Sequence, residues 1–515
     1  MVTARNTLRH QDAGNVMNQV RDRTELRSSD ATLRSRHRFK KNMNKTLPFL
    51  LLAPLMLPVL AVAQGMPPLT QFGTGPLSTG YVDVLAGLAY TDNALLTQSQ
   101  HSGDGIGTVG LNMDYERHGR LSLDLLGNID RIEYIQHSFS GSFYGQFNGD
   151  ALWGKPTDPI QWMLNDSFGE GMTDPLAAPT PTNLQWVNQV STGPFLNLNL
   201  GLRNRLTVYG EYARSTYQRS PYDSQTFEGG AQISHQLAGD TSISVLASDA
   251  RTKYTDRAAL ASTPGAGSAY NVKQAAIQFQ GRYVRTNVSL AAGYNTIDFG
   301  GKTHGSPYYS VQLSRSISPS STVYVSGQSE YSNFGGAMQS PTAQLGVQGG
   351  GLQSGPGLIT SQPFKARIGT LGWNFHRART SFSLSGSYQQ DLYDLQPRND
   401  SRDETVNLTI GRQLRRTVSL QLSGYGSYDD YTELDARTHL YNVSLTLTKQ
   451  LARTSFAIYV RRTQQNGSPG ASGFAAASYH DDMVGVYFTY DVFGHRNSGG
   501  GAGMGGGMPG LPGGM

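Results

Sequence analysis

The chain has 515 residues, with no cysteine, 61 glycines, 27 tyrosines and 15% charged residues. Hydrophobic residues make up 37%, which is below the ~45–50% of an ordinary globular domain and excludes a bundle of membrane helices. Aromatic residues reach 10%, so the chain is not a disordered polymer either. These numbers leave a large β protein rich in Gly, Ser and Tyr. The lack of cysteine excludes disulfides, thiolate metal sites and thiol nucleophiles.

The formal net charge of +5 would suggest a nucleic-acid partner if it were spread over the chain. It is concentrated at the front, because residues 1–42 hold ten Lys or Arg and only four acids. Lys45 adds one more positive charge, which leaves residues 64–515 with a net charge of −2. We therefore expect no nucleic-acid partner.

An apolar run at residues 47–62 follows Met43 and Lys45 and ends in Ala61-Val62-Ala63. This pattern predicts a secretory signal peptide over residues 43–63, cleaved after Ala63. An N-terminal anchor helix preceded by a basic cytoplasmic arm is the alternative. Residues 1–42 show no apolar periodicity, so we expect translation to start at Met43 and this stretch to be an upstream extension. Residues 64–79 are then a periplasmic N-terminal segment.

Polar and apolar residues alternate with a period of two from about residue 80 to residue 493. In residues 441–448, Tyr, Val, Leu and Leu alternate with Asn, Ser, Thr and Thr. Repeated segments of this kind are typical of strands with one face in lipid and the other in water. The chain is thus predicted to be all-β: a transmembrane antiparallel up-and-down β-barrel of about 18 strands (range 16–20), with disordered N- and C-terminal segments.

The predicted connections alternate between short and long, as periplasmic turns and extracellular loops do. Tight turns are expected near residues 118–120, 203–204, 284–285, 377–379, 415–416 and 452–453. Long loops are expected at residues 169–183, 256–270, 335–363, 394–404 and 463–478. The pattern places the protein in the outer membrane of a Gram-negative cell, in contact with lipid and lipopolysaccharide.

The last predicted strand carries Gly485 with aromatic residues three and five positions later. This spacing resembles the final-strand signal that barrel-insertion machinery recognises, although Met483 replaces the usual polar residue. A Gly- and Met-rich tail follows the strand, and residues 494–515 are expected to be disordered.

The chain shows no motif for catalysis or metal binding. It contains no Gly-x-Ser-x-Gly sequence, and His235, His304, His376, His439 and His480 are scattered singly. We predict a protein that is not an enzyme and that uses no cofactor and no metal. A Ser and a His on neighbouring strands could still assemble in space, so an outer-membrane hydrolase stays open as an alternative.

Three short stretches carry a family resemblance: residues 87–93 (GLAYTDN), 191–195 (STGPF) and 220–223 (SPYD). With them the chain resembles the outer-membrane barrels of the β-barrel porin 2 family over residues 80–493. The resemblance implies a channel or accessory protein for exopolysaccharide or capsule export, with a polysaccharide and an export apparatus as partners. A general diffusion porin and an adhesin-like barrel are two rival functions for the same architecture.

Strand parity predicts which polar side chains line the lumen, where carboxylates, amides and aromatic rings suit sugars. These candidates are Asp124, Tyr209, Glu211, Tyr324, Gln328, Glu330, Gln389, Asp391, Gln421 and Tyr425. Any polar lumen needs such residues, so the lining fits a porin equally well. The long loop 335–363 is a candidate constriction, with Gln339, Gln344, Gln348 and Gln353 as its polar side chains.

Overall fold

The computed structural model describes residues 78–99, 101–155, 157–256, 260, 268–338, 359–394, 397–468 and 476–492. Within this part the chain forms β1 (Ser78–Thr91), β2 (Asp104–Arg117), β3 (Leu121–Tyr134), β4 (Ser142–Trp153), β5 (Ile160–Met172), β6 (Leu184–Asn199), β7 (Asn204–Tyr217), β8 (Ser224–Ala238), β9 (Thr241–Tyr254), β10 (Tyr270–Tyr283), β11 (Thr286–Phe299), β12 (Lys302–Ser318), β13 (Ser321–Ser332), α3 (Phe334–Met338), β14 (Phe364–Arg377), β15 (Thr380–Leu392), η2 (Pro397–Asn399), β16 (Ser401–Arg415), β17 (Val418–Tyr431), η3 (Thr432–Leu434), β18 (Ala436–Gln450), β19 (Thr454–Gly467) and β20 (Tyr479–Asp491). No helix in these ranges is long and apolar enough to cross a membrane. The predicted segments 1–42 and 43–63, residues 64–77 and the tail 494–515 lie outside the described residues.

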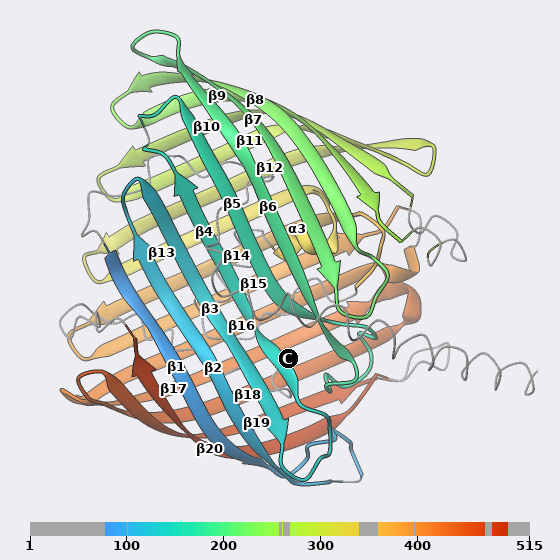
Figure 1. Cartoon of the computed structure of the whole chain (residues 1–515), viewed down its shortest axis with the longest axis vertical. Coiled ribbons are helices and arrows are strands. Elements are labelled where there is room, and N and C mark those ends of the chain that lie inside the picture. Colours follow the sequence, from blue (N-terminus) through green and yellow to red (C-terminus); the bar gives the residue numbers. More distant parts are fainter. Residues whose placement is uncertain are drawn as a thin grey trace, which may run out of the picture. The chain divides into compact units, whose positions relative to one another are not determined.

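The twenty strands form one closed antiparallel sheet. Each strand pairs with the next along the chain, and β1 pairs with β20 from Asp83 opposite Asp491 to Thr91 opposite Met483. Closure leaves no free sheet edge, so every strand has partners on both sides. Figure 1 shows the two walls, with the blue to green N-terminal strands crossing the yellow to red C-terminal ones. The predicted all-β up-and-down barrel is confirmed, and its strand number lies at the upper end of the expected range.

The two ends of the barrel differ in the length of their connections. At one end, β10 and β11 are joined by Val284 and Arg285 alone, and β16 and β17 by Arg416 and Thr417. The chain also enters β1 and leaves β20 at this end. The other end carries the long loops. Two connections there are short: residues 432–435 between β17 and β18, and the turn between β11 and β12, where Gly300 and Gly301 adopt φ values of +59° and +77°. Barrels of the outer membrane have short periplasmic turns and long extracellular loops, which sets the orientation.

The outer face of the barrel is apolar and exposed. In β18, Tyr441, Val443 and Leu445 are 52%, 53% and 42% exposed, whereas Ser444 between them is 2% exposed. A water-soluble protein would bury such residues, but in a bilayer they face the hydrocarbon. The protein is therefore an outer-membrane β-barrel, as the alternation predicts.

Small hydroxyl side chains line much of the inner face and bond across neighbouring strands. The hydroxyls of Ser423 and Ser444 lie 2.5 Å apart, and those of Ser455 and Thr489 lie 2.6 Å apart. Such pairs satisfy polar groups on the wall itself and leave room inside for other elements.

Candidate functional site: a constriction inside the barrel

The strand pairing between β4 and β5 covers only part of their length. These strands pair from Trp153 opposite Trp162 to Phe147 opposite Phe168, and the pairing stops there. Beyond this point β5 pairs only with β6, up to Met172 opposite Leu184. The extracellular end of the β5–β6 hairpin therefore separates from β4. The sequence-based loop at residues 169–183 begins too early, because Gly169–Met172 still belongs to this hairpin.

A side chain bridges the place where the two strands part. Glu170 is 7% exposed, and its Oε1 accepts a hydrogen bond of 2.8 Å from the backbone N–H of Gly145 in β4. The carboxylate takes the place that a backbone carbonyl would hold in a continuous ladder. Gly145 has a φ of +134°, a conformation open to glycine.

The tip of the hairpin reaches the opposite wall. Leu176, in the β5–β6 loop, packs with Tyr431 of β17, Ala436 of β18 and Ala476 of the β19–β20 loop. The backbone oxygen of Leu176 accepts a 2.7 Å hydrogen bond from the N–H of Ala477. Since β5 and β17 are far apart round the closed sheet, the hairpin crosses the extracellular half of the lumen.

A second element packs on the other face of the hairpin. α3 follows β13, and its Phe334, which is fully buried, packs with Val187 of β6 and with Ile359, which precedes β14. The stems of the β13–β14 connection thus leave their own wall to meet the hairpin. Asn333 secures them by donating a 2.6 Å hydrogen bond to the hydroxyl of Tyr270.

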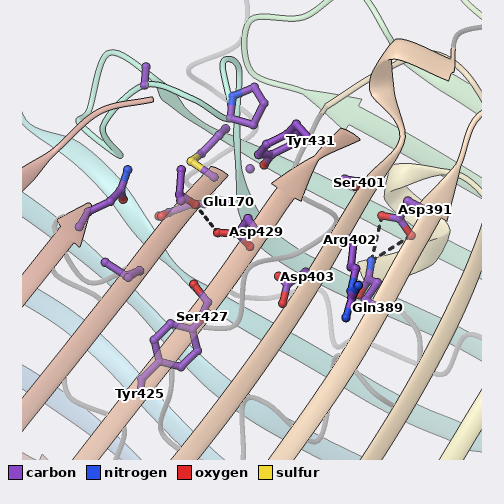
Figure 2. Close-up of a pocket in the computed structure, with 17 residues that line it drawn as sticks. Glu170, Gln389, Asp391, Ser401, Arg402, Asp403, Tyr425, Ser427, Asp429 and Tyr431 are labelled. Carbon is purple, nitrogen blue, oxygen red and sulfur yellow. Dashed lines mark hydrogen bonds between the residues drawn. The ribbon is translucent and has the colours of Figure 1, made fainter. Parts of the chain in front are cut away.

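Between the hairpin and the β15–β19 wall lies a pocket with about 810 Å³ of empty space, part of it open to solvent. Four carboxylates line it: Glu170 from the hairpin and Asp391, Asp403 and Asp429 from three neighbouring strands of the wall (Figure 2). The Gln389 amide donates to both oxygens of Asp391, at 3.2 and 3.0 Å. The Thr438 hydroxyl donates to Asp429 at 2.6 Å.

Aromatic side chains complete the lining of the pocket. Tyr425 and Tyr431 stand on the same face of β17 as Asp429 and Ser427 (Figure 2). Arg402 also touches the pocket, but its guanidinium pairs with Glu404 and lies 5.3 Å from the centre of the Tyr388 ring. The pocket therefore offers carboxylate oxygens, amides and phenol rings to whatever enters it.

The ten lumen candidates all lie on the strand faces that alternate with the exposed apolar residues. Three of them, Gln389, Asp391 and Tyr425, meet in the pocket. Gln421 is on the same face of β17, four residues nearer the periplasmic end. Asp124 lies elsewhere, opposite Glu116 on one neighbouring strand and Asp150 on the other.

The remaining candidates belong to two other parts of the wall. The Tyr209 hydroxyl donates a 2.8 Å hydrogen bond to Glu228, which sits directly opposite Glu211. On β13, Gln328 donates to Glu330 at 3.0 Å, and both are buried. Tyr324, on the same face of β13, has its ring over Gly372 of β14. Gln339, Gln344, Gln348 and Gln353 lie outside the described residues.

Comparisons with known proteins identify no family for the chain. No family model matches the chain, and no curated protein matches it. Among solved structures, a mutant of the ferric enterobactin receptor (PfeA) from Pseudomonas aeruginosa matches at 12% identity and a TM-score of 0.42, covering 81% of this chain and 80% of that one. The siderophore receptor PirA from Acinetobacter baumannii matches at 9% and 0.41, and the copper transporter OprC at 12% and 0.39, each over 80% of both chains.

The predicted membership of the β-barrel porin 2 family is wrong. No model of any family, this one included, matches the chain. The three short stretches behind the resemblance occupy ordinary positions in the barrel. Residues 87–93 begin in β1 and extend two residues past its end, residues 191–195 lie within β6, and residues 220–223 belong to the β7–β8 loop. Glycines, turns and alternation of this kind recur in barrels of many families, so they carry no family signal.

Sequence reasoning missed several residues of the pocket. Glu170 lies in a stretch that the sequence pattern assigns to a loop. Its one local signal is that it shares the parity of the outward-facing Ile160 and Trp162, where an acid would face lipid if the strand stayed in the wall. The sequence pattern could have identified Asp429 and Tyr431, because they share the parity of Gln421 and Tyr425 on β17. Asp403 falls in the predicted loop 394–404, and only the ladder between β16 and β17 places it opposite Asp429.

Proposed function

We propose that this barrel is a channel for small hydrophilic solutes with a preference for cations, and that the crossing hairpin forms its constriction. The observation that carries this proposal is the convergence of Glu170, Asp391, Asp403 and Asp429 on one pocket between the hairpin and the opposite wall. Carboxylates that line a narrow, partly desolvated passage attract cations and repel anions more strongly than they would in open water.

A barrel of this size is wide enough for solutes to pass, but the elements inside the lumen limit the size of those solutes. Barrels of 16–18 strands already leave an aqueous lumen. Here the hairpin and the stems at Phe334 and Ile359 occupy part of that space. Solutes must pass beside them, in contact with tyrosine rings, amides and carboxylates that can bond hydroxyl groups.

Export of a polysaccharide loses the support of the family resemblance. A polymer that threads the lumen would also have to displace the hairpin tip, which packs on the far wall through Leu176. A diffusion porin, which the strand pattern allows equally, needs no such displacement. We therefore place small solutes before polymers.

The test is the reversal potential of the folded barrel in planar bilayers under a KCl gradient. The wild-type barrel should favour K⁺ over Cl⁻, and the triple variant E170Q/D391N/D429N should lose most of that preference. The matched control is E404Q, because this carboxylate stands on the outer face and pairs with Arg402. A wild-type barrel that is folded but does not conduct, or one that favours Cl⁻, would overturn the proposal. Equal selectivity in the triple variant and the wild type would overturn the role of the pocket.

A further inference from the structure

Two histidines and an aspartate meet at the extracellular end of the seam between the first and last strands. Asp92 follows β1, His101 lies in the β1–β2 loop, and His480 is the second residue of β20. One possible ligand atom from each of the three falls within 4.8 Å of the others. The two imidazole rings are tilted by 57° with their centroids 4.4 Å apart.

Backbone contacts hold all three residues in place. The N–H of Asp92 donates to the oxygen of Asp482 at 3.1 Å, and the N–H of Asp482 donates back to Asp92 Oδ1 at 2.8 Å. The Asn93 amide donates to the His480 oxygen at 2.7 Å. The residue next to His101 is also held, because the backbone oxygen of Ser102 accepts a 2.8 Å hydrogen bond from the N–H of Ala94.

The ligand types match those of a divalent transition metal. Two imidazole nitrogens and a carboxylate oxygen suit Zn²⁺ and Cu²⁺, whereas Mg²⁺ and Ca²⁺ prefer oxygen alone. Ligand atoms around one zinc ion lie about 3.3 Å apart, given bonds of about 2.0 Å in a tetrahedron. Rotation of the exposed His101 side chain would close the remaining distance. In the described part of the chain, neither imidazole has a hydrogen-bond partner that a metal would have to displace.

We propose that Asp92, His101 and His480 form a site for Zn²⁺ or Cu²⁺ that clasps the barrel seam. The site joins two parts of the chain that become neighbours only when the barrel closes. Asn93, next to Asp92, is hydrogen-bonded to His480, which lies 387 positions later in the sequence. A metal held there links the start of the barrel to its end. Because the unfolded chain has no such site, binding stabilises the closed barrel.

The experiment uses the full mature barrel, folded in detergent, with Zn²⁺ as the probe. Isothermal titration should give about one Zn²⁺ per barrel for the wild type. The temperature at which the folded band disappears in heat-modifiability gels should rise by about 3 °C or more with Zn²⁺ and fall again with EDTA. H101A and H480A should lose both effects. H101Q is a second variant at this position, and because residue 101 lies in a loop outside the strand ladder, the substitution leaves the barrel pairing intact.

The matched control is H439A, which removes an imidazole at the same end of the barrel but away from the seam. The His439 ring is tilted by 40° against the Tyr428 ring, with the centroids 4.8 Å apart. The H439A barrel should bind Zn²⁺ like the wild type. Absence of Zn²⁺ binding by the wild type would overturn the proposal. So would equal binding by H101A, H101Q and H480A, or an equal stabilisation by Mg²⁺, which would indicate only a general attraction to surface carboxylates.

Discussion

Glu170 and Gly145 face each other across the gap where β5 leaves β4, and the Glu170 carboxylate accepts the Gly145 N–H at 2.8 Å. A side chain thus replaces the backbone ladder at the base of the crossing hairpin. This contact closes the wall while letting the hairpin turn into the lumen.

Replacement of Glu170 by Ala should loosen the hairpin. The buried N–H of Gly145 would lose its acceptor, at a cost of about 1–3 kcal/mol. Faster hydrogen exchange at Gly145 and a larger, noisier single-channel conductance are the expected results. Glu170→Gln keeps an acceptor oxygen, so it should retain slow exchange at Gly145 even though it weakens cation preference. Unchanged exchange in the Ala variant would show that Glu170 does not hold the gap.

Introduction of a side chain at Gly171 should displace the stems of the β13–β14 connection. A Cβ there would lie 2.5 Å from Phe334 Cζ and 2.7 Å from Ile359 Cδ1. We expect Gly171→Ala to weaken this docking by about 1–3 kcal/mol and to change the conductance. Gly369→Ala is the control, because nothing lies within 4 Å of a Cβ at that position. If both variants conduct like the wild type, the stems do not narrow the path.

A cysteine pair should lock the hairpin tip to the far wall. The hydrogen bond between Ala477 N and Leu176 O brings the two backbones close, and a disulfide requires about 4.4–6.8 Å between Cα atoms. The chain has no cysteine of its own, so L176C/A477C can form only the intended bond within one barrel. Faster migration of the unheated oxidised protein, or mass spectrometry of the linked peptides, would detect it. A pair that stays reduced under mild oxidant would contradict the docked tip.

Charge on the outer face should be far more costly than charge on the inner face. An Arg in place of Leu445, which is 42% exposed on the lipid side, should destabilise the barrel by about 2–4 kcal/mol. Ser383 bonds to Asn374 on the inner face, where an Arg can reach water. Urea unfolding in lipid vesicles measures both, and similar losses at the two positions would refute the assignment of faces.

The barrel could be predicted from the sequence alone. The alternation of polar and apolar residues in stretches such as 441–448 predicts which side chains face lipid, because each strand places successive residues on opposite faces. Turn residues and loop lengths determined the strand ends and the orientation, as at Val284-Arg285. These signals are local, so they can be interpreted without knowledge of which strands meet.

Which elements fill the barrel and which residues meet at its seam could be learned only from the folded structure. Glu170 stands on the same face of β5 as the exposed Ile160 and Trp162, and only the lost pairing with β4 beyond Phe168 turns this face away from lipid and into the lumen. Leu176 has no local signal for contact with Ala436 and Ala476, and His480 has none for His101. Such contacts join segments that are distant in sequence, and they arise when closure of the sheet brings opposite walls and both chain ends together.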